Sequence, residues 1–438
     1  MALSKRNRLL MGLTLFSMFF GAGNLIFPPF LAYQAGEATW PAMVGFCLSA
    51  IGFPVLGVVA VAKAGGLDAM ARRVHPVFAQ VFVLLTYLSI GPGLAIPRNA
   101  GTSFEMAVLP FLREGAPVSL LRTGYSVLFF GIALFIALRP EKLSDRLGKI
   151  LTPILLALIV AVFVGCVVTA NNGYAQVDSG PYLSHPLAQG FLDGYQTMDT
   201  IAALNFGLII ALNIRAKGVE EEKGVVRETI RAGWLAGGLL LLVYCALAHV
   251  GGVAGGTFEG ATNGAGTLSG MVARLFGPVG SILLAVIFVI ACLNTCVGLL
   301  TCCSDYFHIL LPKVPYRGWV VFFAVTSTVV ANAGLDAILS VSVPILGAIY
   351  PVAIVLIVLA LCHEWVRHAP NIYPVAILFT GVVSVLTELN GLGLCPAVLA
   401  RVLQGLPLAS KGLPWLVPAF AGVIVGIVLP KKKERRED

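Results

Sequence analysis

Residues Phe19–Pro29 read FFGAGNLIFPP and interrupt an apolar segment that is long enough to span a membrane. Gly21 and Gly23 permit backbone conformations that other residues avoid, and Pro28 and Pro29 remove N–H donors from a helix. Backbone polar groups cannot stay unpaired in lipid, so a broken helix persists at membrane depth only where it is buried in protein or lines a cavity. The stretch therefore predicts a cavity-lining break in the first membrane-spanning helix.

The composition of the whole chain is that of a membrane protein with several spans. Of 438 residues, 58% are hydrophobic and 11% charged, whereas a soluble domain is about half apolar and a quarter charged. The net charge of +8 does not require a nucleic-acid partner, and we expect none, because membrane proteins concentrate Lys and Arg in cytoplasmic loops. The first apolar segment lacks a signal-peptide cleavage pattern, so we expect it to stay in the lipid bilayer. No obligate protein partner is evident.

Twelve apolar segments are long enough, at about 20 residues, to cross a bilayer. They lie at residues 9–33, 40–62, 76–97, 120–138, 150–170, 187–213, 232–254, 277–302, 318–334, 339–361, 371–389 and 414–430. The third segment could also continue through Pro97 and Arg98 toward Leu109. We therefore predict an all-α membrane protein with twelve transmembrane helices. The Gly- and Leu-rich residues 391–412 are consistent with an extracellular loop or a shallow interfacial helix.

The positive charges divide unevenly between the two sides that these segments define. With a cytoplasmic N-terminus, 23 of the 29 Lys and Arg residues fall in cytoplasmic segments. The six on the other side are Arg98, Arg113, Arg122, Arg274, Arg401 and Lys411. Cytoplasmic loops are enriched in Lys and Arg, so we expect both termini in the cytoplasm. Residues 431–438, KKKERRED, are predicted to form a basic cytoplasmic tail on the anionic inner leaflet.

A second interruption lies in the sixth apolar segment, where Gly190–Gly207 reads GFLDGYQTMDTIAALNFG. Thr197 and Asp199 belong to a polar cluster in its middle, and a carboxylate at membrane depth usually faces a cavity or a partner. The two breaks lie in the first and sixth segments, five segments apart. This spacing indicates an inverted repeat with a ligand site at the midplane. We accordingly predict a first five-helix repeat at 1–170, a second inverted one at 187–361, and two peripheral helices at 371–430.

Two such breaks offer the chemistry that a zwitterionic amino acid requires. The N-terminus of a half-helix has free N–H groups at a positive dipole end, which suit a carboxylate, and the C-terminus has free carbonyls, which suit Na⁺ or an ammonium group. Asn294 and Thr295 in the eighth segment, with the carbonyl of Ala291, could complete a cation site beside the first break. The alternative for these residues is hydrogen bonding between helices.

The remaining polar residues and motifs are more simply explained by structure than by catalysis. Cys292 and Cys296 have helical i, i+4 spacing, but no His or carboxylate joins them, so we interpret both as packing residues. Arg98 and Glu105 flank the outer end of the third segment and are interpreted as a structural or gating ion pair. No zinc-protease, nucleophile-elbow or P-loop motif occurs, so the sequence does not indicate an enzyme. A channel is disfavoured because channels gather identical filter segments, whereas these two breaks differ.

Four separated motifs resemble the bacterial branched-chain amino acid carrier family of the cation-coupled LIV-II type. They are FFGAGNLIFPP, YLSIGPGLAIPRNAG (Tyr87–Gly101), GYQTMDTIAALNFG and VSVPILGAIYP (Val341–Pro351). The family is linked to the amino acid–polyamine–organocation superfamily, whose fold is the LeuT-type five-plus-five inverted repeat with broken first and sixth helices. The resemblance implies a multi-pass symporter of the bacterial cytoplasmic (inner) membrane that imports leucine, isoleucine and valine with Na⁺ as the coupling ion.

The resemblance also implies roles for residues at the breaks. It places the substrate carboxylate on the backbone N–H groups of Ala22 and Gly23. The predicted substrate-binding residues are Phe20, Gly21, Ala22, Gly23, Asn24, Thr197, Met198 and Asp199. The predicted Na⁺ ligands are Ser17, Phe20, Ala291, Asn294 and Thr295. Asn294 departs from the Thr or Ser that is usual at its position, although an amide oxygen still binds Na⁺.

Asp199 and Asn24 keep several readings open. Asp199 could pair with the substrate ammonium group, help a second cation, or take up a proton. The last reading gives the alternative function, an H⁺-coupled amino acid symporter that uses Asp199. Asn24 could serve the substrate, a second cation, or the break itself.

Overall fold

The computed structural model describes residues 3–138, 143–169, 173–176 and 180–429, and the regular elements within them are helices. The predicted tail at 431–438 lies outside the described residues. The α-helices are α1 (Lys5–Phe19), α2 (Ala22–Ala35), α3 (Thr39–Cys47), α4 (Phe53–Ala64), α5 (Leu67–Arg72), α6 (Pro76–Leu88), α7 (Ala95–Ala107), α8 (Val118–Ala137), α9 (Leu143–Thr169), α10 (Pro181–Ser184), α11 (Pro186–Asp193), α12 (Asp199–Ala216), α13 (Glu222–Gly255), α14 (Gly264–Leu310), α15 (Tyr316–Ala331), α16 (Leu335–Leu361), α17 (His363–Val366), α18 (Ile372–Gly391), α19 (Ala397–Gln404) and α20 (Leu416–Val428). Short 3₁₀ or π turns, η1 (Gly36–Ala38), η2 (Leu48–Gly52), η3 (Ser89–Gly93), η4 (Leu109–Phe111), η5 (Gly194–Thr197) and η6 (Ala409–Lys411), join some of them.

The prediction of an all-helical, multi-span protein is confirmed. Eight helical stretches in the described part of the chain are long and apolar enough to cross a membrane, and one of them, Ala22–Ala64, contains the second predicted segment and the end of the first. Three shorter apolar helices cover Leu156–Val168, Tyr316–Ala331 and Leu416–Val428. The count of twelve spans and the inverted repeat stay predictions. Residues 391–412, left open by the sequence, contain the short helix α19.

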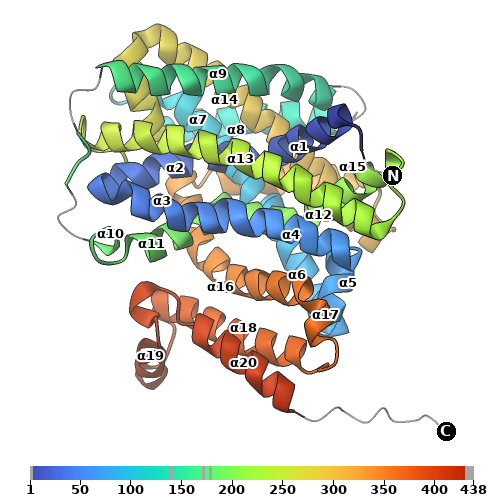
Figure 1. Ribbon diagram of the computed structural model, residues 1–438. Coiled ribbons are helices and arrows are strands. Elements are labelled where there is room, and N and C mark those ends of the chain that lie inside the picture. The colour runs from blue at the N-terminus through green and yellow to red at the C-terminus, as the bar shows by residue number, and fades with distance from the viewer. Residues whose placement is uncertain (1–2, 139–142, 170–172, 177–179, 430–438) are drawn as a thin grey trace.

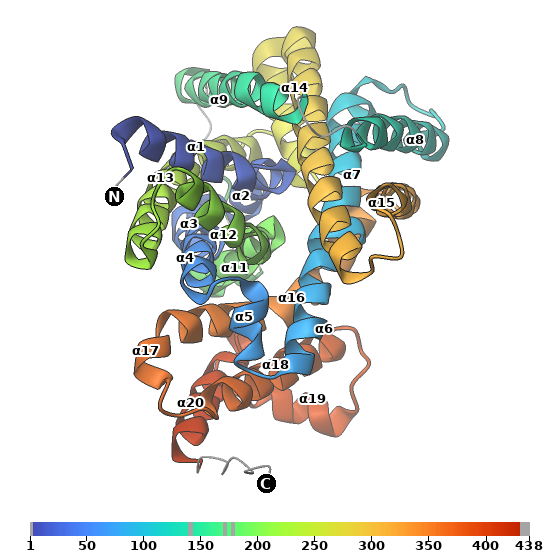
Figure 2. The ribbon, with the colours of Figure 1, turned by 90° about the vertical axis from the view of Figure 1, so that its right-hand side faces the viewer.

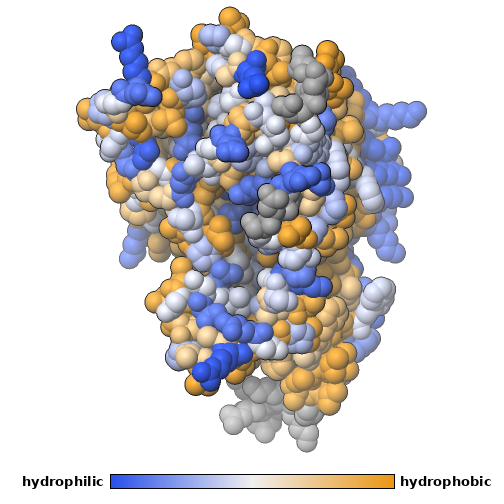
Figure 3. Space-filling model, turned by 90° about the vertical axis from the view of Figure 1, so that its left-hand side faces the viewer, coloured by the Kyte–Doolittle hydropathy of each residue, from blue (hydrophilic) through white to orange (hydrophobic). Residues whose placement is uncertain are grey.

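The outside of the helix bundle is apolar, as a bilayer requires. Large side chains such as Trp234 on α13, Val279 on α14 and Phe322 on α15 are exposed, which is unfavourable in water and favourable in lipid. Figure 3 faces the end of the bundle that lies at the left in Figure 1, where hydrophilic residues gather over the middle and hydrophobic residues along the edges. The bundle therefore has polar character at an end and apolar character along its sides.

The helices form a central group around the breaks and a peripheral group at one edge of the molecule. Helix α2 packs along α13 (Figure 1), and α14 packs along both α7 (Figure 2) and α2. Helices α18 and α20 pack on each other at one edge of the molecule in both views, and α18 also packs on α16. The core around α2, α7, α12, α13 and α14 thus brings together the first, third, sixth, seventh and eighth predicted segments.

The first predicted break is present between α1 and α2. Phe20 (φ −72°, ψ 92°) and Gly21 (φ −124°, ψ −170°) are extended and separate the two helices. The amide oxygen of Asn24 accepts a hydrogen bond from the Gly21 N–H at 3.0 Å, so this side chain caps the new helix. Pro28 and Pro29 are the seventh and eighth residues of α2, so they lie inside this helix.

The second predicted break is present between α11 and α12. The 3₁₀ turn η5 ends at Thr197, and Met198 then takes the left-handed conformation, with φ 63° and ψ 8°. A non-glycine residue in this region is uncommon and is held there by its surroundings. The carboxylate-bearing Asp199 is consequently the first residue of α12.

A third break, which the apolar pattern did not predict, interrupts the third segment. Gly91 in η3 has φ −89° and ψ −131°, and a side chain there would start 3.0 Å from the Sγ atom of Cys303 on α14. The sequence left the third segment to end at residue 97 or to continue toward Leu109, and α7, from Ala95 to Ala107, agrees with the longer alternative. The sequence signal was the Gly-Pro-Gly of residues 91–93. Arg98 therefore lies in the first turn of a membrane-embedded helix.

The contact between α3 and α11 yields a stability prediction. A Cβ atom on Gly45 would overlap the carbonyl oxygen of Leu187, so a G45V substitution forces the two helices apart and should cost about 1–3 kcal/mol. We expect a lower thermal unfolding midpoint for the purified protein in detergent. The control is G131A on α8, where no atom outside the helix's own backbone lies within 4 Å of the added methyl group. An unchanged midpoint for G45V would contradict this close helix contact.

The conformation of Met198 yields a second stability prediction. A β-branched residue is strained in the left-handed region, so M198V should destabilise the protein by about 1–3 kcal/mol, whereas M198G should relieve backbone strain. Leu408 has the same φ 63° and ψ 8° far along the chain, so L408V and L408G give the matched comparison. If L408V lowered the unfolding midpoint and M198V did not, Met198 would not be left-handed.

Candidate functional site

Asn24 connects the first break to the second. Its Nδ2 group donates a hydrogen bond of 2.5 Å to Asp199 Oδ2 and lies 2.5 Å from the hydroxyl oxygen of Tyr244. The Tyr244 hydroxyl lies 3.3 Å from the same Asp199 oxygen. These three side chains are at most 3% exposed. Because Oδ1 of Asn24 caps α2 at the same time, both ends of this amide are used within the protein.

Two predicted residues of the second break shape the turn before α12. The Thr197 hydroxyl accepts a hydrogen bond of 3.3 Å from the Asp199 N–H and donates one of 2.9 Å to the Gly194 carbonyl. Met198 is 2% exposed. Their role as substrate contacts stays a prediction, and the structure shows that Thr197 holds the turn.

Ala22 and Gly23, the predicted carboxylate ligands, are the first residues of α2. The N–H groups of a first helical turn have no carbonyl partner within the helix, and the positive end of the helix dipole lies at the same place. Gly21, Ala22 and Gly23 therefore present an anion-compatible helix start beside Asp199. Phe20 stacks on Phe16, with 4.9 Å between ring centroids, and is half-buried.

Thr295 of α14, one of the predicted cation ligands, lies against the first break. The Thr295 hydroxyl donates to the Ala291 carbonyl at 3.1 Å, and a side chain on Gly21 would start 3.5 Å from the Thr295 methyl group. Oxygen atoms of this kind are the ligands that hard cations prefer, so the local chemistry fits Na⁺. Ser17 on α1 is exposed and Asn294 on α14 is half-buried. The five-residue cation set stays a prediction.

The interpretation of Arg98 and Glu105 as an ion pair is wrong. Arg98 is 5% exposed, and its Nη1 donates a 2.6 Å hydrogen bond to the Gln196 carbonyl at the second break. Glu105 instead accepts a 2.7 Å hydrogen bond from Asn263. The ion-pair interpretation followed from ending the third segment at residue 97, whereas α7 extends to Ala107 and agrees with the longer alternative.

The four motifs converge on the breaks. Tyr350, from the fourth motif, stacks on Tyr195 of η5 with 4.4 Å between ring centroids, and both rings are buried. Arg98, from the second motif, reaches η5, and Asn24 of the first reaches Asp199 of the third. Sequence reasoning missed Tyr244, because a tyrosine in an apolar helix carries no local signal. It also missed the depth of Arg98, which the charge in YLSIGPGLAIPRNAG could have indicated.

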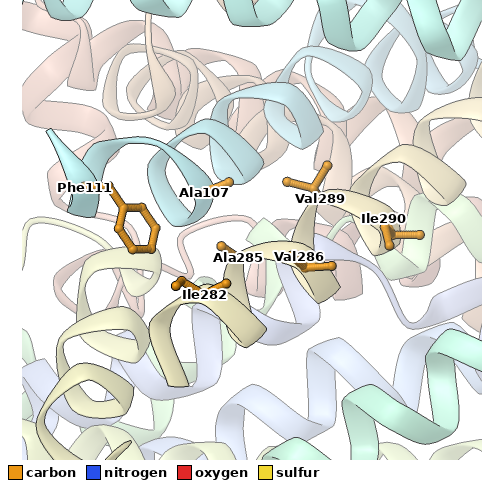
Figure 4. Close-up of a pocket in the computed structure, with 7 residues that line it drawn as sticks. All are labelled: Ala107, Phe111, Ile282, Ala285, Val286, Val289 and Ile290. Atoms are coloured by element: carbon orange, nitrogen blue, oxygen red, sulfur yellow. The ribbon is translucent and has the colours of Figure 1, made fainter. Parts of the chain in front are cut away.

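A surface groove lies between the end of α7 and α14, away from the breaks (Figure 4). Figure 4 shows Ala107 and Phe111 on one side and α14 residues on the other. Its lining consists of Ala107, Phe111, Ile282, Ala285, Val286, Val289 and Ile290. These side chains offer no hydrogen-bonding group for the polar ends of an amino acid, so the groove is not the candidate site.

The fold of this chain is similar to those of two solved proteins, Mhp1 and MhsT. It superposes on Mhp1, a nucleobase-cation-symport-1 family transporter solved in a closed conformation with bromovinylhydantoin bound, with a TM-score of 0.63 and 14% identity, covering 95% of this chain and 91% of Mhp1. It superposes on MhsT in complex with L-phenylalanine with a TM-score of 0.56 and 14% identity, covering 96% and 99%. Both are LeuT-fold transporters.

Sequence relatives are named as branched-chain amino acid transporters. The chain is 42% identical over 427 residues to the branched-chain amino acid transport system 2 carrier protein of Pseudomonas aeruginosa, covering 96% of this chain and 95% of the relative. It is 38% identical over 430 residues to the branched-chain amino acid permease BraB of Bacillus subtilis, covering 98% and 96%. A family profile described as branched-chain amino acid transport protein matches residues 4–433. The protein is therefore not an enzyme, and it belongs to the branched-chain amino acid transport protein family.

Proposed function

We propose that this protein is a secondary active transporter that imports leucine, isoleucine and valine by Na⁺ symport. The observation that carries the proposal is the pair of broken helices that Asn24 joins through Asp199, in a chain with a LeuT-type fold. The names of the relatives support the substrate class. We assign the chain to the LIV-II type on the four motifs quoted above.

The arrangement in the membrane is part of the proposal. We assign the first inverted repeat to residues 1–170 and the second to 187–361, in the bacterial cytoplasmic membrane, with both termini in the cytoplasm. The uneven division of Lys and Arg supports this orientation. The Lys5 end of α1 and the Val428 end of α20 also lie toward the same end of the bundle (Figure 1).

Each end of the substrate has a complementary part of the breaks. The N–H groups of Ala22 and Gly23 receive the carboxylate, and Phe20 and Met198 offer apolar surface to the branched side chain. The carbonyls of Phe20 and Ala291 and the hydroxyl of Thr295 would hold Na⁺. Such an ion stabilises the conformation in which α14 and the first break are in contact, which couples its binding to that of the substrate.

One observation favours H⁺ coupling as a second candidate. Asp199 is 3% exposed, and none of the four ion pairs in the described part of the chain includes it. Buried carboxylates inside membranes serve as proton relays in many pumps and transporters. The two candidates place the coupling ion differently, with Na⁺ near Thr295 and a proton on Asp199.

Uptake of labelled leucine into proteoliposomes tests the proposed function. We expect saturable accumulation above equilibrium when a Na⁺ gradient is imposed, together with counterflow, which a channel does not show. A pH gradient without Na⁺ should drive no accumulation. Absence of gradient-driven accumulation under both conditions would overturn the proposal of a symporter.

The Asp199→Asn variant separates Na⁺ from H⁺ coupling. If Na⁺ is the coupling ion, D199N should take up leucine more slowly but keep its strict Na⁺ dependence, because the amide keeps a hydrogen-bonding oxygen for Asn24. The control is D68N on α5, where the exposed carboxylate only pairs with Arg72. If a pH gradient drives uptake in the wild type and no longer does so in D199N, the coupling ion is H⁺ and the proposal of Na⁺ symport is wrong.

The Thr295→Ala variant tests the cation site itself. Removing one charge-assisted oxygen contact should raise the Na⁺ concentration for half-maximal uptake by about 10- to 100-fold. T326A is the matched control, because the Thr326 hydroxyl also bonds a carbonyl of its own helix, that of Phe322 at 2.8 Å. Equal Na⁺ dependence in T295A and T326A would remove Thr295 from the cation site.

A further inference from the structure

Arg98 places a buried positive charge between the two breaks. A Cβ atom on Gly23, at the start of α2, would lie only 2.9 Å from Arg98 Nη2, so the guanidinium lies directly beside that backbone. On its other side, Nη1 donates to the Gln196 carbonyl at the end of η5, at 2.6 Å. The guanidinium carbon also lies 5.3 Å from the ring centroid of Phe27, above the ring face.

The charge of Arg98 lacks a close counter-charge. None of the four ion pairs in the described part of the chain includes it. Asp199 attracts it from beyond ion-pair distance, while the carboxylate itself bonds Asn24 and Tyr244. A buried charge without a partner is costly, and truncation studies of buried pairs show how much such a charge depends on its partner. A single carbonyl also uses one of the five N–H donors of a guanidinium.

A second feature independently calls for an anion at the same place. The first N–H groups of α2 and the positive end of its dipole lie at Ala22 and Gly23, next to the guanidinium. Two positive features side by side repel each other unless a negative group lies between or beside them. A carboxylate satisfies both, because its two oxygens match the planar fork of an arginine and the backbone donors of a helix start.

We propose that Arg98 binds the carboxylate of the transported amino acid, together with the backbone N–H groups of Ala22 and Gly23. This inference rests on the proposed function and adds a side-chain ligand to it. It assigns a purpose to the third break, because η3 ends one helix and lets α7 restart with Arg98 in its first turn. It also explains why residue 23 is glycine, since a side chain there would displace the guanidinium.

Ligand-dependent thermal stabilisation of the purified full chain in saturating Na⁺ tests this proposal without requiring transport. The probes are leucine and leucinamide, which lacks the carboxylate charge. For R98Q we expect apparent leucine affinity to fall about 30-fold or more, which is the usual effect of truncating one partner of a buried charged pair. Leucinamide binding should change less than about 3-fold on the same reasoning. The same scan reports whether each variant unfolds cooperatively.

Two further variants keep the test decisive. R113Q removes an exposed positive charge from the loop after η4 and should behave as the wild type. R98K keeps the charge and approximate size but loses the fork, so its preference for leucine over leucinamide should fall about 10-fold, between wild type and R98Q. If R98Q does not fold, an R98K protein with the wild-type preference overturns the proposal.

The rival role for Arg98 is to balance Asp199, and a double variant separates the two. In the D199N background the carboxylate charge is absent, so R98Q should still abolish the preference for leucine over leucinamide if Arg98 binds substrate. A double variant with the same preference as D199N overturns the proposal. Failure of the wild type to bind leucine would instead overturn the proposed function, so the two failures are distinguishable.

Discussion

The hydrogen bond from Asn24 to Asp199 is the interaction on which the centre of this structure depends. Two of the three breaks, those in the first and sixth predicted segments, lie at membrane depth, where unpaired backbone groups are costly. One side chain addresses both breaks, because Oδ1 of Asn24 caps the start of α2 and its Nδ2 bonds the first residue of α12. A shift of either half-helix would therefore break the cap, the interhelical bond, or both. The first and sixth predicted segments are linked by chemistry that an apolar side chain could not supply.

The surrounding helices turn this link into a site with charge. Tyr244 on α13 completes the hydrogen bonding of Asp199, and Arg98 on α7 reaches the carbonyl end of η5. The guanidinium then lies on the side of Gly23, and the Thr295 side chain lies on the side of Gly21. The two glycines thus separate a region suited to an anion from a region suited to a cation. A zwitterion bound with a cation would use both regions at once.

The sequence predicted the parts of this arrangement that have local causes. Glycine, proline and polar residues within apolar segments located both breaks, because each of these residue types disfavours a continuous membrane helix whatever the neighbouring residues are. Met198 was not recognised as the left-handed residue, since methionine gives no such signal and tertiary contacts impose the conformation. Tyr244 was missed for a similar reason, because its partners lie 220 and 45 positions away.

The interpretation of Arg98 depends on where the third membrane span is taken to end. The interpretation of this arginine as an outer charge paired with Glu105 depends on ending the third span at residue 97. In the structure the chain continues from η3 into α7, and Arg98 is buried. The same charge changes meaning with depth, because an exposed arginine needs no partner and a buried one does. The Gly-Pro-Gly sequence of η3, which follows α6, therefore decides where Arg98 lies, as the glycines of the first break decide where α2 begins.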